Sequence, residues 1–240
     1  MQTPNNITNE AHWEEYWKNY RFENVPREVV FEKYMIKLTR GSSCIEIGGF
    51  PGTFAAYFYK RGIRDVTILD FHMDECIVRE LEEQNGLPQN TIQCIQADLF
   101  DYTPDRNYDI VFSLGFIEHF QNTKDVIERH VNLLSPKGQL LILIPNFLGL
   151  NGKIQAKYDP ENLASHNLKS MEISFLKNIM KEFDLGNVEI DYFGKPMLWL
   201  EPKPENKKSR KIVKALSYAS KLFPIKGKLL SPYIAIYARK

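Results

Sequence analysis

The stretch from Cys44 to Thr53, CIEIGGFPGT, constrains the fold more than any other part of the chain. An apolar run typical of a buried strand contains the acid Glu46, and a glycine-rich turn and helix-forming residues 54–60 follow it. Glycine lets the backbone approach a ligand, and the first turn of a helix offers unpaired N–H groups. The junction therefore predicts a site for a small charged molecule, although a tight connection alone would have the same pattern.

Four further apolar runs, 66–69, 91–97, 108–113 and 140–144, are separated by helical patterns over 74–84 and 125–134 and by loops. The runs lack strict alternation of apolar and polar residues, which indicates a parallel sheet covered on both faces. We therefore expect a doubly wound α/β fold, in which ligands bind at the carboxyl ends of the strands. Those ends carry Glu46, Asp70, Asp98, Leu114 and Asn146.

Composition indicates an ordinary globular protein, since 43% of its 240 residues are hydrophobic and 25% are charged. The three cysteines lie far apart in predicted strand or helix interiors, so we expect reduced core thiols and a cytoplasmic location. Residues 1–10 are polar and no 18 consecutive residues are apolar, so we expect neither a secretory signal nor a transmembrane helix. No histidine lies beside a cysteine, which argues against a zinc site.

We expect a helical lid in residues 1–40 and one main domain in residues 41–240. The aromatic spacing of 12–20 predicts a helix that either packs on the body or covers a pocket. A second helix is predicted to start at Pro26. Segment 147–170 is polar and is predicted to be an irregular substrate loop. A helix over 171–183 and strands over 187–193 and 232–238 complete the domain. The expected inner residues of the first two helices are Trp13, Tyr16, Trp17, Tyr20, Val30, Phe31, Tyr34, Met35 and Leu38.

The C-terminal part of the chain is strongly basic. Residues 203–240 contain eleven Lys or Arg and one acid, whereas the preceding 202 residues contain 20 basic and 29 acidic residues. Segment 203–230 is predicted to be a basic helical insertion, in which 207–223 is an amphipathic helix. This helix fits a cover over the sheet or a contact with an anionic membrane surface or a phosphate-bearing substrate. The acidic body disfavours nucleic acid. The apolar stripe of the helix is Ile212, Leu216, Ala219 and Phe223.

Three phrases, IEIGGFPGT, GFIEHF and LLSPKGQLLILIPN, occur in this order together with acids ending the first three strands. With them the sequence resembles the class I S-adenosylmethionine-dependent methyltransferases, in particular the branch that acts on small molecules and on glycan or lipid precursors. The resemblance covers residues 43–146 in detail and the rest in outline. It implies a Rossmann-like, seven-stranded, mainly parallel sheet with an antiparallel last strand, and S-adenosylmethionine as the cofactor.

The resemblance also implies roles for individual residues. Acidic, aromatic and backbone groups would bind the ribose, adenine and methionine portions of the cofactor. Phe50 replaces the middle glycine of the family's turn, so we expect Gly49 to take the unusual backbone torsion and Phe50 to point away or to wall the pocket. Asp70 and Asp98 could instead cap the helices or turns that follow them, and Phe71 could belong to the core. The predicted residues are Glu46, Gly48, Gly49 and Gly52 with Leu114 and Gly115 for methionine, Asp70 for ribose, and Phe71, Asp98 and Leu99 for adenine.

Methyl transfer from a sulfonium is an in-line displacement, so the protein mainly aligns the acceptor and excludes water. His119 is the predicted base for a hydroxyl acceptor, and its alternative role is a hydrogen bond within a helix start. Asn146 and His166 are the predicted substrate contacts. A metal is not expected, because no carboxylate ends the fourth strand. These features favour O-methylation of a small molecule or a glycan or lipid-linked precursor.

Two other functions fit part of the pattern. A nicotinamide oxidoreductase would also use Asp70, but the turn Gly48-Gly49-Phe50-Pro51-Gly52 lacks the G-x-G-x-x-G spacing. A non-catalytic S-adenosylmethionine-binding protein would need no base. The methyltransferase prediction rests on the whole order of motifs rather than on any one of them.

Overall fold

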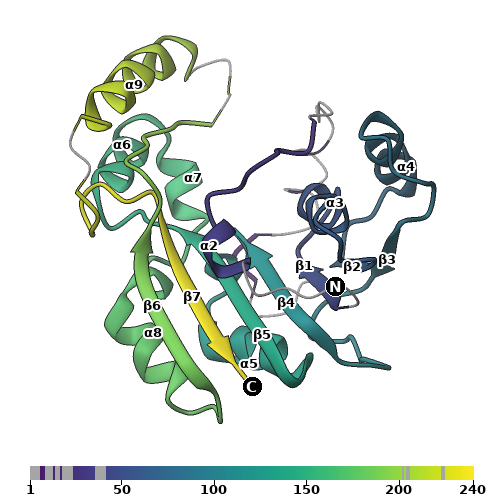
Figure 1. The fold of residues 1–240 in the computed structure, drawn as a ribbon. Helices are drawn as coiled ribbons and strands as arrows, with labels where there is room; N and C mark the ends of the chain where they lie inside the picture. The colour runs from purple at the N-terminus through teal and green to yellow at the C-terminus, as the bar shows by residue number, and fades with distance from the viewer. Residues whose placement is uncertain are drawn as a thin grey trace.

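The computed structural model describes residues 6–8, 13, 17, 24–35, 42–201, 203, 206–222 and 225–240. Its centre is a seven-stranded sheet with the order β3-β2-β1-β4-β5-β7-β6 (Figure 1). Strand β7 runs antiparallel to both of its neighbours, and the other neighbouring pairs are parallel. The strands are β1 (Ser43–Ile47), β2 (Asp65–Asp70), β3 (Ile92–Gln96), β4 (Tyr108–Leu114), β5 (Leu134–Pro145), β6 (Gly186–Phe193) and β7 (Tyr233–Arg239).

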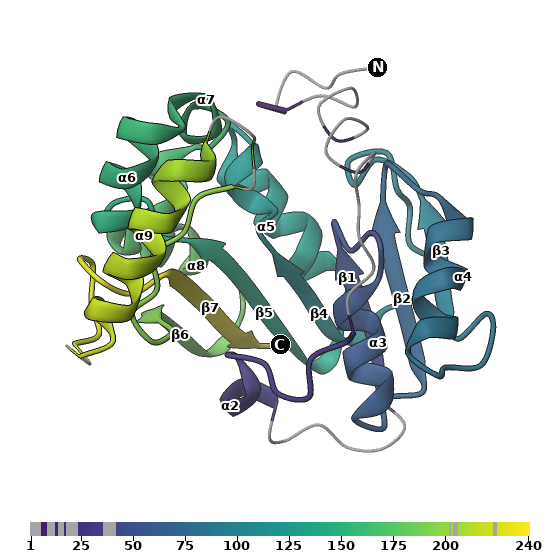
Figure 2. The ribbon, with the colours of Figure 1, turned by 90° about the horizontal axis from the view of Figure 1, so that it is seen from above.

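Helices cover both faces of this sheet, as Figures 1 and 2 show. On one face, α5 and α8 bury Ile127 and Leu176 against β4, β5 and β7. On the other face, α3 and α4 bury Phe58 and Leu81 against β1 and β2. The helices are α2 (Glu32–Met35), α3 (Thr53–Lys60), α4 (Glu75–Gln84), α5 (Thr123–Asn132), α6 (Leu150–Tyr158), α7 (Pro160–Ala164), α8 (Ile173–Met180) and α9 (Lys207–Ser220), with 3₁₀ turns η1 (Ile117–His119) and η2 (Leu168–Met171).

The predicted fold is confirmed, including the antiparallel last strand. The apolar runs form the strands because a strand that is buried on both faces needs apolar side chains at nearly every position. The expectation that 147–170 is irregular is wrong, because this segment contains α6, α7 and η2. The glycines of segment 147–170 had argued against a helix there. Gly152 nevertheless lies within α6, where a Cβ would collide with the carbonyl of Phe147.

The N-terminal region is described only in part. Phe31 and Tyr34 are buried as predicted, but the helix α2 begins at Glu32 rather than at Pro26. Val30 lies before the helix and is 56% exposed, so its predicted inner position is wrong. Tyr16, Tyr20, Leu38 and the side chain of Met35 fall outside the described part of the chain.

Helix α9 packs beside α6, away from the sheet (Figures 1 and 2). Its inner side consists of Val213, Ser217 and Ser220, and Val213 joins Ile154 and Leu198 in a small separate core. The predicted apolar stripe therefore points outwards, since Ile212 and Leu216 are 55% and 51% exposed. Phe223 is outside the described residues.

Cysteine burial agrees with the sequence prediction only in part. Cys44 is buried in β1, whereas Cys76 is exposed in the first turn of α4 and Cys94 is half-buried. In the part of the chain that the structure describes, no helix combines the length and the apolar character needed to cross a membrane.

Candidate active site

Glu46 lies on the buried side of β1 and faces the start of α3. Its carboxylate accepts a hydrogen bond from the backbone N–H of Ala55 at 3.0 Å. Burial raises the pKa of Glu46 well above its usual value, and the nearby charge of Asp70 adds to this effect. The acid thus satisfies an N–H group in the first turn of α3, which has no side-chain cap at Gly52. Its predicted contribution to the cofactor's electrostatics stays a prediction.

The glycine turn differs from the expected conformation. Gly48 and Gly52 have positive φ values of 66° and 99°, whereas Gly49 is not in that region. Gly49 is small for another reason, since a Cβ there would lie 2.7 Å from Cγ of Glu46. At Gly48 a Cβ would collide with the ring of Phe116. The prediction that Gly49 takes the unusual torsion is therefore wrong, because Gly48 takes it and leaves room for Phe116.

Phe50 is buried within this turn. Its ring makes edge contacts with Trp17 and His72, at centroid distances of 5.2 Å and 5.1 Å. The backbone N–H of Phe50 donates to Asp70 Oδ2 at 3.2 Å. The residue that departs from the family's pattern therefore joins the glycine turn to the end of β2, where the predicted ribose-binding acid Asp70 lies.

Asp70 ends β2 and accepts two backbone hydrogen bonds, from Phe50 and from His72. Burial raises its pKa to about 6, although these N–H groups act in the opposite direction. The capping role considered from the sequence is thus present. Each carboxylate oxygen still has a second lone pair, so the role in ribose binding stays compatible with this geometry.

The three residues predicted to contact adenine line one cavity. Phe71, Asp98 and Leu99 face it together with Phe116 and Phe120. Asp98 also caps its own turn, because its carboxylate accepts the N–H of Phe100 at 2.9 Å. The lining is mostly apolar and includes the acid Asp98, and the adenine contacts stay a prediction.

Leu114 ends β4, and Gly115 follows it with a φ of 67°. A Cβ at Gly115 would lie 3.6 Å from Glu118 Oε1. The backbone predicted to surround the cofactor's methionine portion therefore adjoins the side chain of Glu118. Sequence reasoning had assigned no role to this residue.

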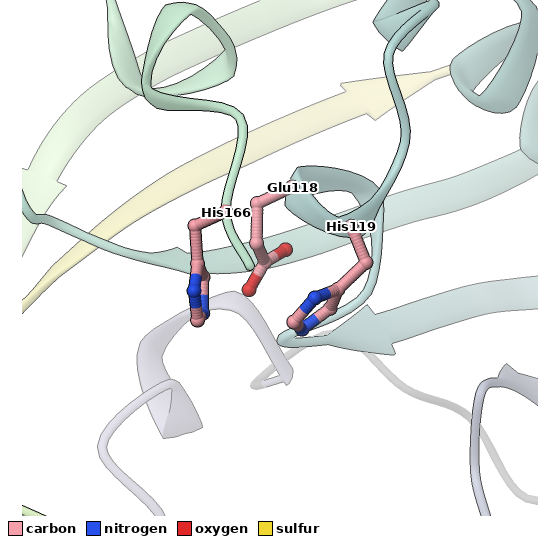
Figure 3. A group of neighbouring side chains, drawn as sticks. All are labelled: Glu118, His119 and His166. Atoms are coloured by element: carbon pink, nitrogen blue, oxygen red, sulfur yellow. The ribbon is translucent and has the colours of Figure 1, made fainter. Parts of the chain in front are cut away.

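Glu118, His119 and His166 come together beside that backbone, and Figure 3 shows the carboxylate next to the two imidazoles. One possible ligand atom of each residue lies within 4.8 Å of those of the other two. Glu118 is fully buried, and neither of its carboxylate oxygens has a hydrogen-bond partner in the described structure. Burial raises the pKa of Glu118 to about 8. A buried carboxylate without a partner is costly and indicates a functional site.

Both histidines are held by backbone carbonyls. His119 Nδ1 lies 3.0 Å from the carbonyl oxygen of Ser165, and His166 Nδ1 lies 2.6 Å from that of Asn162. Asn167 joins the two segments, since its N–H donates to the Glu118 carbonyl at 2.7 Å. The structure thus brings together the two histidines that the sequence proposed separately, and it adds Glu118.

Asn146 has a different environment from the one predicted. Its side-chain nitrogen donates to the carbonyls of Lys228 and Ser231, both at 2.8 Å, and its oxygen accepts the N–H of Leu148. Both amide hydrogens are therefore used to fix segment 228–231 at the end of β5. The structure gives no support to a substrate contact through this side chain.

A row of aromatic rings leads away from the cluster, and we call it the aromatic row. Neighbouring rings in it have centroids between 4.6 and 5.9 Å apart. At one end of the row, Trp13 meets His119 edge-on at 5.2 Å. Together with the Trp17–Phe50 contact, this places two aromatic residues of the predicted lid against both parts of the site. The row consists of Tyr233, Trp199, Phe147, His166, His119 and Trp13.

Comparisons with known proteins agree with this geometry. The family described as "Methyltransferase domain" matches residues 11–190. This chain belongs to the methyltransferase-domain family. The predicted class I fold and the assignment as a methyltransferase are confirmed, and the oxidoreductase alternative is set aside.

Solved structures of methyltransferases share the fold at low sequence identity. An S-adenosylmethionine-dependent methyltransferase from Archaeoglobus fulgidus has a TM-score of 0.57 and 18% identity, with 88% of this chain and 91% of that one covered. An S-adenosylmethionine-dependent methyltransferase from Mesorhizobium loti has a TM-score of 0.57 and 13% identity, with 88% of this chain and 97% of that one covered. Coclaurine N-methyltransferase bound to N-methylheliamine and SAH has a TM-score of 0.55 and 13% identity, with 88% of this chain and 70% of that one covered. No curated protein matches the chain's sequence.

Proposed function

We propose that this methyltransferase transfers a methyl group to an oxygen of a small or lipid-linked acceptor that lies beside Glu118, His119 and His166. The observation that supports this proposal is the position of these side chains next to Gly115, at the end of β4. This edge of the sheet is where class I folds hold their ligands. The aromatic row gives the acceptor an apolar wall, and Trp13 covers it from the N-terminal side.

In the proposed reaction, the acceptor oxygen attacks the methyl carbon of the sulfonium in line with the carbon–sulfur bond. The electron pair of that bond passes to sulfur, which leaves as a neutral thioether. His119 takes up the hydroxyl proton, since an imidazole near neutral pH is suited to this transfer. His166, held by the Asn162 carbonyl, orients the acceptor.

A labelled-methyl assay tests this proposal. Fractions of a cell extract are incubated with the protein and S-adenosylmethionine labelled in the methyl group, and the labelled product is identified by mass spectrometry. We expect an O-methylated small molecule or lipid-linked product. His119→Gln should lower kcat by about 10²–10⁴-fold and leave cofactor affinity unchanged by calorimetry. A labelled amine or carbon, or an unchanged kcat in this variant, would contradict the proposal.

We further propose that α9 and residues 225–229 bind an anionic membrane surface, from which a lipid-linked acceptor would be taken. Large apolar side chains protrude from this surface, and basic side chains surround them. No acid occurs between 207 and 229. The exposed apolar residues are Ile212, Leu216, Tyr218, Leu222, Ile225 and Leu229. The basic residues are Lys207, Lys208, Arg210, Lys211, Lys214, Lys221, Lys226 and Lys228.

Apolar insertion and attraction to anionic lipids act together in such helices. Segment 228–231 is also tied to the end of β5 through Asn146, so this surface is connected to the strand that leads to Phe147 and the aromatic row. Binding to vesicles of phosphatidylcholine with and without phosphatidylglycerol provides the test.

The protein should sediment with the anionic vesicles, and salt should weaken this binding. Replacing Ile212 and Leu216 by Glu should abolish it. The matched control is Val188→Glu on β6, where Val188 is 39% exposed, and it should bind like the wild type. Equal binding to both kinds of vesicle, or no effect of the double substitution, would refute this second proposal.

A further inference from the structure

The cluster of Glu118, His119 and His166 has the composition of a metal site. Two histidines and one carboxylate with an open position hold catalytic zinc in some enzymes and iron in others. Here the possible ligand atoms lie within 4.8 Å of one another. Ligand atoms about 2.1 Å from a tetrahedral ion are roughly 3.4 Å apart, so binding requires the side chains to move inwards by only about an ångström.

The hydrogen bonds of the two imidazoles suit this role. In each ring Nδ1 faces a carbonyl oxygen, of Ser165 for His119 and of Asn162 for His166. A carbonyl only accepts, so Nδ1 carries the hydrogen and Nε2 has the lone pair that a metal ligand needs. In metal-binding histidines, the ring nitrogen that does not bind the metal typically donates such a hydrogen bond, which fixes the tautomer and the ring orientation.

The carboxylate supplies an independent observation. Glu118 is completely buried, and neither of its oxygens has a hydrogen-bond partner among the described residues. A cation held by the three side chains would satisfy these oxygens. His166 is only half-buried and gives access to the site from the segment between α7 and η2.

We propose that Glu118, His119 and His166 bind one divalent transition-metal ion, with Zn²⁺ or Mn²⁺ as suitable ions. This inference rests on the proposed function and changes one detail of it. The ion would act as a Lewis acid toward the acceptor hydroxyl and would favour loss of its proton to solvent. In that state His119 is a ligand and not the base. The methyl group still passes from sulfur to oxygen as described above.

Metal binding is measured directly on the full-length protein, without cofactor or acceptor. The protein is treated with EDTA, dialysed and titrated with Zn²⁺ and with Mn²⁺ by calorimetry, and the retained metal is counted by elemental mass spectrometry. We expect one ion per chain for at least one of the metals. Glu118→Gln and His166→Ala should each weaken binding at least tenfold, with unchanged far-UV circular dichroism.

The matched control is Glu128→Gln, because Glu128 is an exposed glutamate on α5. It should bind the ion like the wild type. Absence of binding in the wild type, or equal binding by Glu118→Gln, would overturn the metal site. Full methyl transfer by the EDTA-treated protein would overturn the role of the ion in the reaction and would leave His119 as the base. One bound ion in a protein that methylates only nitrogen would support the site and refute the proposed O-methylation.

Discussion

The imidazole rings of His119 and His166 are tilted against each other, with centroids 4.6 Å apart and planes inclined by 49°. The two residues come from different segments, η1 and the turn after α7. Backbone carbonyls hold both rings, and the Glu118 carboxylate lies beside them. The three side chains therefore gather just beyond the end of β4.

The first prediction concerns the ribose-binding role of Asp70. Asp70→Asn should weaken S-adenosylmethionine binding by about 10–100-fold, since a lost hydrogen bond to a charged group corresponds to about 1.5–3 kcal/mol. Isothermal calorimetry measures this change. Asp101→Asn, at an exposed turn position, serves as the control and should bind normally. Equal affinities of the two variants would show that Asp70 only caps its turn.

The affinity for S-adenosylmethionine should also depend on pH. Asp70 has a pKa of about 6, raised by burial, and its ionised form accepts hydrogen bonds from the ribose. Protonation below pH 6 removes acceptor capacity, so affinity should fall by up to about tenfold per pH unit there. The part of the affinity that depends on Asp70 should be constant above pH 7. Calorimetry from pH 5 to pH 8 checks this, and Asp70→Asn should abolish the dependence. A wild-type profile that is flat down to pH 5 would exclude Asp70 as the titrating group.

Gly48 and Gly86 provide a matched pair for testing the glycine turn. Both have a φ of 66°, but a Cβ meets the Phe116 ring at Gly48 and nothing within 4 Å at Gly86. Gly86→Ala should lower the free energy of unfolding by about 1–2 kcal/mol, from backbone strain alone. Gly48→Ala should lower it further. Urea denaturation compares the variants, and equal losses would mean that Phe116 moves aside without cost.

A fourth prediction concerns His130, which is buried in α5 and contacts the Val126 carbonyl and the Ser113 hydroxyl. Burial lowers its pKa to about 4. The unfolded state takes up a proton near pH 6.5, whereas the native state does so only near pH 4. His130 therefore stabilises the fold above pH 6.5, and this contribution is lost as the pH falls towards 4.

The contribution of His130 to the free energy of unfolding should fall by up to about 1.4 kcal/mol per pH unit. Urea denaturation of wild type and His130→Gln at several pH values isolates it, because other titrating groups are common to both proteins. The stability advantage of the wild type should shrink between pH 6.5 and pH 4. A difference that does not vary with pH would contradict this assignment.

The sheet was predictable from the sequence because its strands are continuous apolar runs that end in acids or turn residues. Asp70 and Leu114 mark the ends of β2 and β4 where the sequence placed them. The helices α6 and α7 were not predicted, because polar residues and glycines interrupt any apolar periodicity there. Gly152 lies inside α6 for close packing against the Phe147 carbonyl, a cause that depends on tertiary structure.

The outward-facing side of α9 was not predictable for a related reason. Hydrophobicity alone places Ile212 and Leu216 inside, but the docked side uses Ser217, whose hydroxyl accepts the N–H of Leu198 at 3.0 Å. Glu118 was overlooked because its burial and lack of partners appear only in three dimensions. The signal available in the sequence was an acid between Ile117 and His119 in an otherwise apolar segment.

Direct binding of the methyl donor tests the central claim most sharply. S-adenosylmethionine is titrated into the full-length protein by isothermal calorimetry, with NAD as the comparison ligand. We predict one S-adenosylmethionine site per chain, competition by S-adenosylhomocysteine, and no binding of NAD. A folded protein that binds NAD in its place, or that binds neither ligand, would contradict the account.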